Sequence, residues 1–308
     1  TRKAIELNPQ YAMAHSNLGG ILINLGQLQE AEVSILKAIE LNPNLAKPYY
    51  SLSTLKYSSN NNTILKDQLF SESILKSKLD QDKIDIYFAR ANVLHQENNY
   101  EESSRYLKLA NRLKLEINPS QPEKIFDHSQ VLLLKSDKKR INPNEHRDSA
   151  ENLFIVGMPR SGSTLLESIL SINNNVNDLG EINILEESFL EWGKNAQGLT
   201  LYEIYCKQLT NNQDDLKITT NKWLSNYQYA GIISNHIPNS KIIHCYRNPL
   251  DNILSIYRAH FAKGNEYSSS LVDCTRVYLD QEEIMTKYKN RFSSKIYDLN
   301  YDSLVSNP

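Results

Sequence analysis

Apolar and small residues alternate with polar ones at helical spacing in the N-terminal third of the chain. They fall on two predicted helices, at Leu18, Gly19, Leu22, Ala31, Ile35 and Ala38. Gly19 and Ala31 are small enough to let the two helices approach closely, while Ile35 and Ala38 are placed to pack against a following pair. Pro43 ends the second helix, because proline cannot continue it. The pattern predicts a helical hairpin that ends at Pro43.

The sequence KAIELNP occurs at Lys3–Pro9 and again at Lys37–Pro43. The two copies are 34 residues apart, which is the period of the tetratricopeptide repeat. The hairpin pattern resembles the same repeat. The next unit keeps Tyr49 and Leu52 in register, and a later copy returns around Leu107. We therefore expect three repeats and the end of an upstream one.

The repeats predict an α-solenoid over residues 1–115. Such an array either supports the fold or offers a concave groove to a protein or peptide partner, and both interpretations stay open. Residues 116–150 have a looser pattern with several prolines and the charged run Asp137–Arg140. We expect a linker and one connecting helix there, with the charged run exposed to solvent.

A different pattern begins near residue 151. The apolar, β-branched run Leu153–Val156 predicts a short strand, Gly157–Thr164 a loop, and Leu165–Leu170 a helix. The loop keeps the G-x-x-x-x-G spacing at which backbone N–H groups and a helix N-terminus point toward an anion. A nucleotide-hydrolysing loop would continue with Lys, but this one has Ser163 and carries its positive charge at Arg160. The loop therefore predicts an anion site of another kind.

A second strand-to-helix junction spans Ser240–Arg258. Arg247 lies at the predicted strand end, and Ser255 falls about two turns into the helix. Ligands bind beyond the carboxyl ends of parallel strands, so we expect both junctions to face one crevice and to hold one dianionic ligand.

These motifs resemble the sulfotransferases that use 3'-phosphoadenosine 5'-phosphosulfate (PAPS), and among them the tyrosylprotein-sulfotransferase-like branch. The loop is similar to the family's 5'-phosphosulfate loop, the second junction to its 3'-phosphate motif, and Tyr301–Val305 to a segment whose Tyr contacts the nucleotide. The resemblance implies that PAPS is bound by Pro159, Arg160, Ser161, Gly162, Ser163, Thr164, Arg247, Ser255 and Tyr301.

The resemblance also implies two catalytic residues. Glu181, after Gly180, is similar to the catalytic base of that branch, and Lys222, after Asn221, to its transition-state lysine. Glu181 would take the proton of the acceptor hydroxyl, Lys222 would neutralise the departing oxygen, and Arg160 would help the loop to hold the 5'-phosphate. Read without the family pattern, Glu181 is an ordinary acid before a helix and Lys222 an ordinary surface charge. By analogy with phosphoryl transfer, positioning and charge stabilisation supply most of the catalysis, and no metal site is expected.

Composition narrows the class of protein. The chain has 308 residues and a formal net charge of -2 from 34 basic and 36 acidic side chains, so we expect no nucleic-acid partner. Its apolar runs are far shorter than the roughly 20 residues that cross a bilayer, so no membrane span is expected. Three cysteines without a CxxC pattern argue against a disulfide framework or zinc site and suit the cytoplasm. The opening Thr1, within a repeat, suggests a fragment.

We therefore predict an α-solenoid of tetratricopeptide repeats over 1–115, a linker with a connecting helix over 116–150, and an α/β P-loop-type parallel-sheet sulfotransferase domain over 151–308 that is C-terminally incomplete. The expected reaction transfers the sulfonate of PAPS to a hydroxyl of a protein or peptide tyrosine, a saccharide or a small molecule. Two alternatives remain: a repeat scaffold with an inactive nucleotide-binding domain, and a P-loop nucleotide kinase, which Ser163 disfavours.

Overall fold

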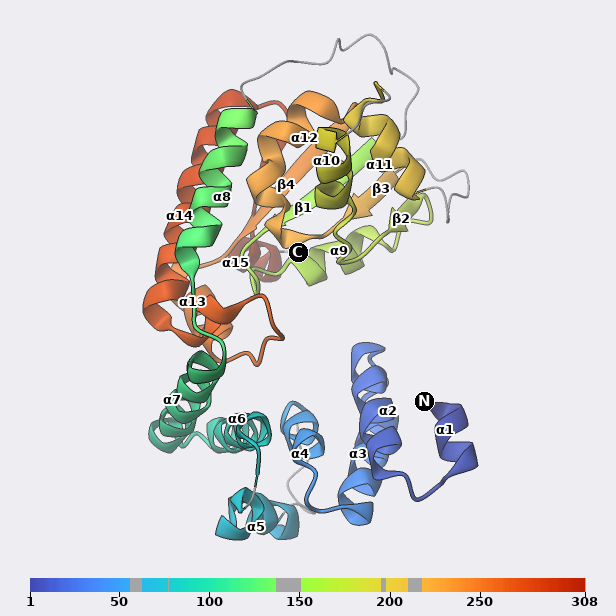
Figure 1. Cartoon of the computed structure of the whole chain (residues 1–308), viewed down its shortest axis with the longest axis vertical. Helices are drawn as coiled ribbons and strands as arrows, with labels where there is room; N and C mark the ends of the chain where they lie inside the picture. Colours follow the sequence, from blue (N-terminus) through green and yellow to red (C-terminus); the bar gives the residue numbers. More distant parts are fainter. Residues whose placement is uncertain (56–62, 77, 137–150, 195–197, 210–217, 308) are drawn as a thin grey trace. The chain divides into compact units, whose positions relative to one another are not determined.

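The computed structural model describes residues 1–55, 63–76, 78–136, 151–194, 198–209 and 218–307 (Figure 1). The chain divides into two compact units. The first contains Thr1–Ser120 together with His260–Ser270, and the second contains Gln121–Ala259 together with Leu271–Pro308.

The described part of the first unit consists of helices and their connections. In order these are α1 (Arg2–Leu7), α2 (Ala12–Asn24), α3 (Leu28–Leu41), α4 (Ala46–Ser53), α5 (Thr63–Phe70), η1 (Glu72–Leu75), α6 (Asp80–Gln96), α7 (Tyr100–Ile117) and η4 (Glu266–Ser269). Helices α2 and α3 pack against each other, as do α6 and α7. The predicted helical array is confirmed.

Small residues set the approach of α2 to α3. A Cβ on Gly19 would collide with the side chain of Ile35 across the hairpin. Ala31, Ile35 and Ala38 are completely buried, and α3 ends at Leu41, just before Pro43. The close approach of the two helices that the hydrophobic pattern predicts at Gly19 and Ala31 is therefore confirmed.

The second unit is built around a five-stranded sheet of order β2-β3-β1-β4-β5, in which every neighbouring pair is parallel. The strands are β1 (Glu151–Gly157), β2 (Val176–Asp178), β3 (Ile218–Asn221), β4 (Ser240–Tyr246) and β5 (Ile296–Asn300). The helices are α8 (Pro122–Lys135), α9 (Ser163–Leu170), α10 (Ile184–Lys194), α11 (Leu201–Leu209), η3 (Leu224–Tyr229), α12 (Ala230–His236), α13 (Pro249–Tyr257), α14 (Leu271–Arg291) and α15 (Tyr301–Ser306).

The central strand β1 is buried on both faces. Phe154 and Val156 belong to a core cluster with residues of α10, α11, α12 and α14. Ile155 packs on the other face, against Leu166 of α9. Burial on both faces favours apolar side chains at successive positions, which explains the unbroken apolar run Leu153–Val156.

The parallel arrangement brings all five carboxyl ends to one edge of the sheet. Each end is followed by predicted site residues: Glu181 after β2, Lys222 after β3, the glycine loop after β1, Arg247 after β4 and Tyr301 after β5. A sheet of this kind binds ligands at that edge. The predicted α/β parallel-sheet architecture is confirmed, and it places the predicted residues within one region.

Helix α8 lies in the span expected to link the two domains, yet it packs in the second unit. Leu132 joins the core cluster of the sheet. The Oγ of Ser129 donates to Oδ2 of Asp280 on α14, at 3.1 Å. The remainder of that span, including Asp137–Arg140, lies outside the described residues. Helix α8 is thus a component of the sheet unit.

The segment that joins α13 to α14 packs in the first unit. Nε2–H of His260 donates to Oδ1 of Asp85 at 2.8 Å, and its ring stacks on that of Phe88 with centroids 4.6 Å apart. Nζ of Lys114 donates to the carbonyl of Phe261 at 3.0 Å. The span 151–308 therefore contains residues that pack with the repeats.

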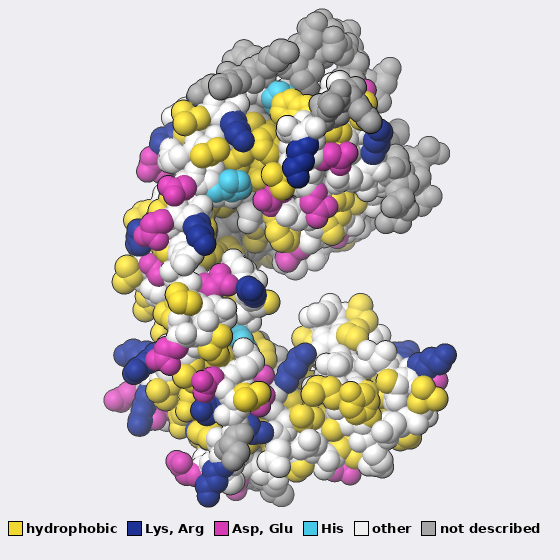
Figure 2. Space-filling model, in the orientation of Figure 1, with side chains coloured by type: hydrophobic (Ala, Val, Ile, Leu, Met, Phe, Trp, Pro, Cys, Tyr) yellow, Lys and Arg dark blue, Asp and Glu magenta, His cyan; other side chains and the backbone are white. Residues whose placement is uncertain are grey.

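Charged side chains of both signs are interspersed on the face drawn in Figure 2. No single-sign field dominates the described part of that face, in keeping with the small net charge. Among the described helices, none combines the length and apolar character that crossing a membrane requires.

Candidate active site

The loop after β1 adopts a backbone conformation that requires glycine. Gly157 has a φ of 142° and Gly162 a φ of 91°, values that other residues rarely adopt. A Cβ on Gly157 would collide with the carbonyl of Cys245 in β4, and a Cβ on Gly162 would collide with the ring of Tyr301. The glycine spacing thus serves both the turn and the close packing of its neighbours.

Helix α9 starts directly after Gly162 and directs its N-terminus to the carboxyl edge of the sheet. First-turn N–H groups have no acceptor within their own helix, so they are available to an anion. The Oγ of Ser161 is buried and has no hydrogen-bond partner among the described residues. Arg160 has a φ of 68°, in the left-handed region. These features suit the oxygen atoms of a phosphate or sulfonate group.

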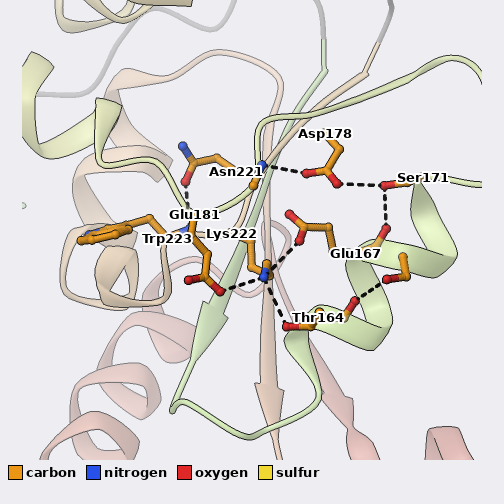
Figure 3. A network of polar contacts seen from close by, with 10 residues as sticks. Thr164, Glu167, Ser171, Asp178, Glu181, Asn221, Lys222 and Trp223 are labelled. Atoms are coloured by element: carbon orange, nitrogen blue, oxygen red, sulfur yellow. Dashed lines mark hydrogen bonds and ion pairs between the residues drawn. The ribbon is translucent and has the colours of Figure 1, made fainter. Parts of the chain in front are cut away.

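A group of four charged residues and one threonine, called here the Lys222 cluster, lies beside this N-terminus (Figure 3). It comprises Thr164, Glu167, Asp178, Glu181 and Lys222. Nζ of Lys222 lies 2.8 Å from Oε1 of Glu181 and 3.1 Å from Oε2 of Glu167. It also donates to Oγ1 of Thr164 at 3.2 Å. The ammonium group is therefore held by two carboxyl groups and one hydroxyl.

The cluster is buried on one side and open on the other. The side chains of Lys222 and Glu167 are only 6% and 8% exposed, whereas that of Glu181 is 60% exposed. A molecule arriving from solvent can therefore reach Glu181, while Glu167 is enclosed.

Burial and pairing shift the pKa values of the enclosed groups. Burial acts to lower the pKa of Lys222, but the hydrogen bonds with Glu181 and Glu167 together outweigh it and raise the pKa. Burial raises the pKa of Glu167 to about 7, a hydrogen bond with Asp178 acts in the same direction, and Lys222 opposes both. Lys222 is thus cationic at neutral pH, and Glu167 exchanges a proton there.

Backbone contacts fasten the turn after β2 to the end of β3. The N–H of Lys222 donates to the carbonyl of Gly180 at 3.0 Å. Nδ2 of Asn221 donates to the carbonyl of Ile182 at 3.2 Å, and the N–H of Gly180 donates to Oδ1 of Asp178 at 2.7 Å. These bonds flank Glu181 on both sides and hold it opposite the lysine.

A second feature, called here the arginine hollow, opens between the loop and α13. It has a volume of about 380 Å³ and is lined by Arg160, Arg247, Asp251, Leu254, Ser255, Arg258 and Ala259. Nε of Arg160 donates to Oγ of Ser255 at 3.3 Å. The loop arginine and the two residues predicted to bind a 3'-phosphate therefore line one space.

Arg247 is held in place by residues that follow β5. Its guanidinium carbon lies 5.0 Å from the ring centroid of Tyr301, and its Nε lies 3.8 Å from Oδ1 of Asp302. That Nε is buried and has no hydrogen-bond partner among the described residues. Oδ2 of Asp302 accepts from the N–H of Asn248. The ion pair with Asp302 is loose, so the arginine retains capacity to bind an anion.

The structure brings the predicted residues into two adjoining groups. Thr164, Glu181 and Lys222 meet in the Lys222 cluster. Arg160, Arg247 and Ser255 meet in the arginine hollow. The ring of Tyr301 adjoins both the loop at Gly162 and Arg247. Their roles in binding and catalysis remain predictions.

The other loop residues lie at the base of these two groups. Ser163 is buried in the first turn of α9. The carbonyl of Pro159 accepts from Nδ2 of Asn252 at 3.0 Å, which ties the loop to α13. The tie keeps the loop and the helix that carries Ser255 together.

Sequence reasoning missed Glu167 and Asp178. Glu167 is three residues after Thr164 on α9, a spacing that puts both on one helix face, and this signal was available. Asp178 ends β2, and only the pairing of β2 with β3 reveals which residues it meets. Arg258, left outside the predicted site, lines the arginine hollow.

The described residues hold no group of three or more His, Cys, Asp or Glu side chains arranged to take a metal ion. The donors that converge on the edge of the sheet are ammonium, guanidinium, hydroxyl and backbone N–H groups. Such donors bind anions.

Comparisons with known proteins agree with this picture. Residues 1–33 and 84–116 match tetratricopeptide-repeat families. The chain is similar to an uncharacterized protein of Aquifex aeolicus (strain VF5), with 25% identity over 333 aligned positions that cover 100% of this chain and 43% of that protein. The chain thus spans less than half the length of that relative. Residues 152–308, about half of the chain, contain the parallel sheet with its glycine loop and match the family described as the sulfotransferase family, and the chain belongs to that family.

Proposed function

We propose that this protein transfers the sulfonate group of PAPS to an acceptor hydroxyl and releases adenosine 3',5'-bisphosphate. The observation that carries the proposal is the position of Lys222. Its buried ammonium contacts both the first turn of the anion-binding helix, through Thr164, and an exposed carboxylate, Glu181. A charge-neutralising group and a proton acceptor therefore stand side by side at the mouth of an anion site.

The chain's residues fit a nucleotide that carries phosphate at two positions. The loop N–H groups and the unpartnered Ser161 hydroxyl suit the 5'-phosphosulfate end. The unpartnered Nε of Arg247 suits the 3'-phosphate. Arg160 lines the same hollow as Arg247, so we assign it to the 3'-phosphate and not to the 5'-phosphate.

In the proposed reaction, the acceptor oxygen forms a bond to sulfur as the bond from sulfur to the bridging oxygen breaks. Glu181 takes the proton of the acceptor hydroxyl. Lys222 stabilises the negative charge that collects on the departing oxygen, which keeps the electron pair of the broken bond. Prearranged charge of this kind is commonly the largest contribution to catalysis.

The acceptor is a hydroxyl group of a protein or peptide tyrosine, a saccharide or a small molecule. The exposure of Glu181 is compatible with each of these. Protein recognition through the repeats is part of the proposal, because tetratricopeptide arrays present surfaces to peptides.

Calorimetry tests the proposal against its two alternatives. The protein should bind adenosine 3',5'-bisphosphate tightly and ATP with Mg²⁺ weakly, and it should consume PAPS when acceptors of the three classes are supplied. Preference for ATP with Mg²⁺ would favour a nucleotide kinase. Tight binding of adenosine 3',5'-bisphosphate without transfer to any acceptor class would favour the inactive scaffold.

A further inference from the structure

The Lys222 cluster contains more carboxyl groups than the proposed reaction uses. Glu181 serves as base, but Glu167 and Asp178 have no role in it. Glu167 approaches the same ammonium as Glu181, from the enclosed side and only 0.3 Å farther away, at 3.1 Å against 2.8 Å. A single buried cation is therefore shared between a carboxyl that faces solvent and one that does not.

Glu167 has one oxygen without a donor and a second carboxyl group as a neighbour. Its Oε1 is buried and has no hydrogen-bond partner among the described residues. Burial raises the pKa of this carboxyl, and the neighbouring carboxyl of Asp178 acts in the same direction. Like charges in one enclosed site are strongly disfavoured, so both effects favour the protonated form of Glu167.

Asp178 has two donors of its own. Its Oδ1 accepts from the N–H of Gly180 at 2.7 Å, and its Oδ2 accepts from Oγ of Ser171 at 3.2 Å. Among the described residues, the carboxyl of Glu167 contacts donors of one residue, Lys222. The two carboxyl groups are therefore stabilised unequally, and Glu167 depends on Lys222.

We propose that Glu167 is a positioning residue that competes with Glu181 for the Lys222 ammonium, and that its loss of a proton releases Glu181 to act as the base. When Glu167 is protonated, Lys222 pairs with Glu181 alone, and the carboxylate is occupied. When Glu167 is ionised, it attracts the ammonium toward the enclosed side. The inference rests on the proposed function, because it concerns the base of that reaction.

The direction of the pH dependence follows from the groups that face Glu167. These are Lys222 from the end of β3 and Asp178 from the end of β2, with Glu181 on the far side of the ammonium; Thr164 and Ser171 are neutral. Because burial holds the pKa of Glu167 near 7, turnover should fall as pH drops below about 7. An ordinary glutamate base would lose activity only near pH 4.

Two substitutions test the competition, with Glu187→Gln on the exposed surface of α10 as a matched control. Glu167→Gln mimics the protonated state at every pH. Its turnover should be about tenfold below that of the unmodified protein at pH 8, where Glu167 is mostly ionised, and within about twofold of it at pH 6, where Glu167 is mostly protonated. Asp178→Asn offers an N–H donor to ionised Glu167. It should therefore shift the acidic fall in turnover to lower pH.

The contrary outcomes are equally specific. The contradicting result is a Glu167→Gln variant that is slower by the same factor at all pH values, with turnover falling over the same pH range as in the unmodified protein. That result would show that Glu167 is only structural. An Asp178→Asn variant whose turnover falls over the same pH range as before would contradict the influence of Asp178 on Glu167. This variant keeps the carboxyl of Glu167 and remains informative if Glu167→Gln folds poorly.

A second readout does not depend on turnover. Carboxyl ¹³C resonances of the protein should include one glutamate that titrates near pH 7, and this resonance should vanish in Glu167→Gln and persist in Glu187→Gln. Absence of such a resonance overturns the inference even if sulfonate transfer is observed. If this resonance is present but the protein transfers no sulfonate, the result contradicts the proposed function and not the titration of Glu167.

Discussion

The Lys222 cluster and the arginine hollow are both cationic regions of one edge of a sheet, yet their charges are compensated differently. Lys222 is buried and contacts two carboxyl groups at 2.8 and 3.1 Å. Nε of Arg247 lies 3.8 Å from Oδ1 of Asp302 and has no hydrogen-bond partner among the described residues. A buried cation depends strongly on its carboxyl partners, which hold Lys222 in place, whereas Arg247 keeps the capacity to bind an anion. On this contrast we base the proposal that the cluster serves the chemistry and the hollow binds the ligand.

The largest expected effect is on turnover in the cluster. Glu181→Gln keeps the size of the side chain and its contact with Lys222 but cannot accept a proton. Turnover should fall by about 10² to 10⁴, while affinity for adenosine 3',5'-bisphosphate holds or improves slightly. Steady-state kinetics and calorimetry measure the two effects. A variant with more than about a tenth of the normal turnover would remove Glu181 from the mechanism.

Replacement of Lys222 tests the contribution of the cation in the same cluster. Lys222→Met should lower turnover by about 10² to 10³, the usual cost of one prearranged charge-stabilising group. Glu167 then loses its cation and stays protonated at neutral pH, so the variant should fold, as circular dichroism would verify. An equal loss in nucleotide affinity and in turnover would assign Lys222 to binding and erase the distinction between the two regions.

The arginine hollow should show the opposite profile. Arg247→Ala should weaken adenosine 3',5'-bisphosphate by roughly ten- to a hundredfold, because a charge-assisted partner of a desolvated phosphate contributes about 1.5 to 3 kcal/mol. AMP, which lacks the 3'-phosphate, should be affected far less in calorimetry. Arg276→Ala, which removes an arginine paired with Glu123 on the surface, is the control. Equal losses for both nucleotides would contradict the assignment of the hollow.

The smallest effect on the site should come from the segment that packs with the repeats. His260→Ala removes the hydrogen bond to Asp85 and the stacking on Phe88, a loss of about 1 to 3 kcal/mol to local stability. Hydrogen exchange should speed up in α6 and in residues 260–270, with nucleotide affinity nearly unchanged. Unchanged exchange would mean that these contacts do not hold the segment, and a large loss of affinity would extend the binding region beyond the hollow.

Patterns over a few neighbouring residues were enough to predict much of the fold. The two glycines of the loop, the apolar run before them and the helix after them are local features, and local propensity decides them. The same holds for Gly19 and Ala31 in the repeats, because a helical hairpin is formed by residues close in sequence. Family resemblance then added Glu181 and Lys222, whose positions local chemistry alone does not distinguish from ordinary surface charges.

The sequence by itself therefore determined the two architectures, the glycine loop and the place of Arg160 within it, because these depend on periodicity and on glycine geometry. Only the tertiary structure decided which charges meet. Glu167 lies 55 residues before Lys222, and the pairing of β3 with both β2 and β1 brings the ends of these strands together. The proximity of Asp178 to Glu167 and the packing of His260 on the repeats arise in the same way. A pKa depends on burial and on neighbours in space, and strand order, which is not a local property, chooses those neighbours.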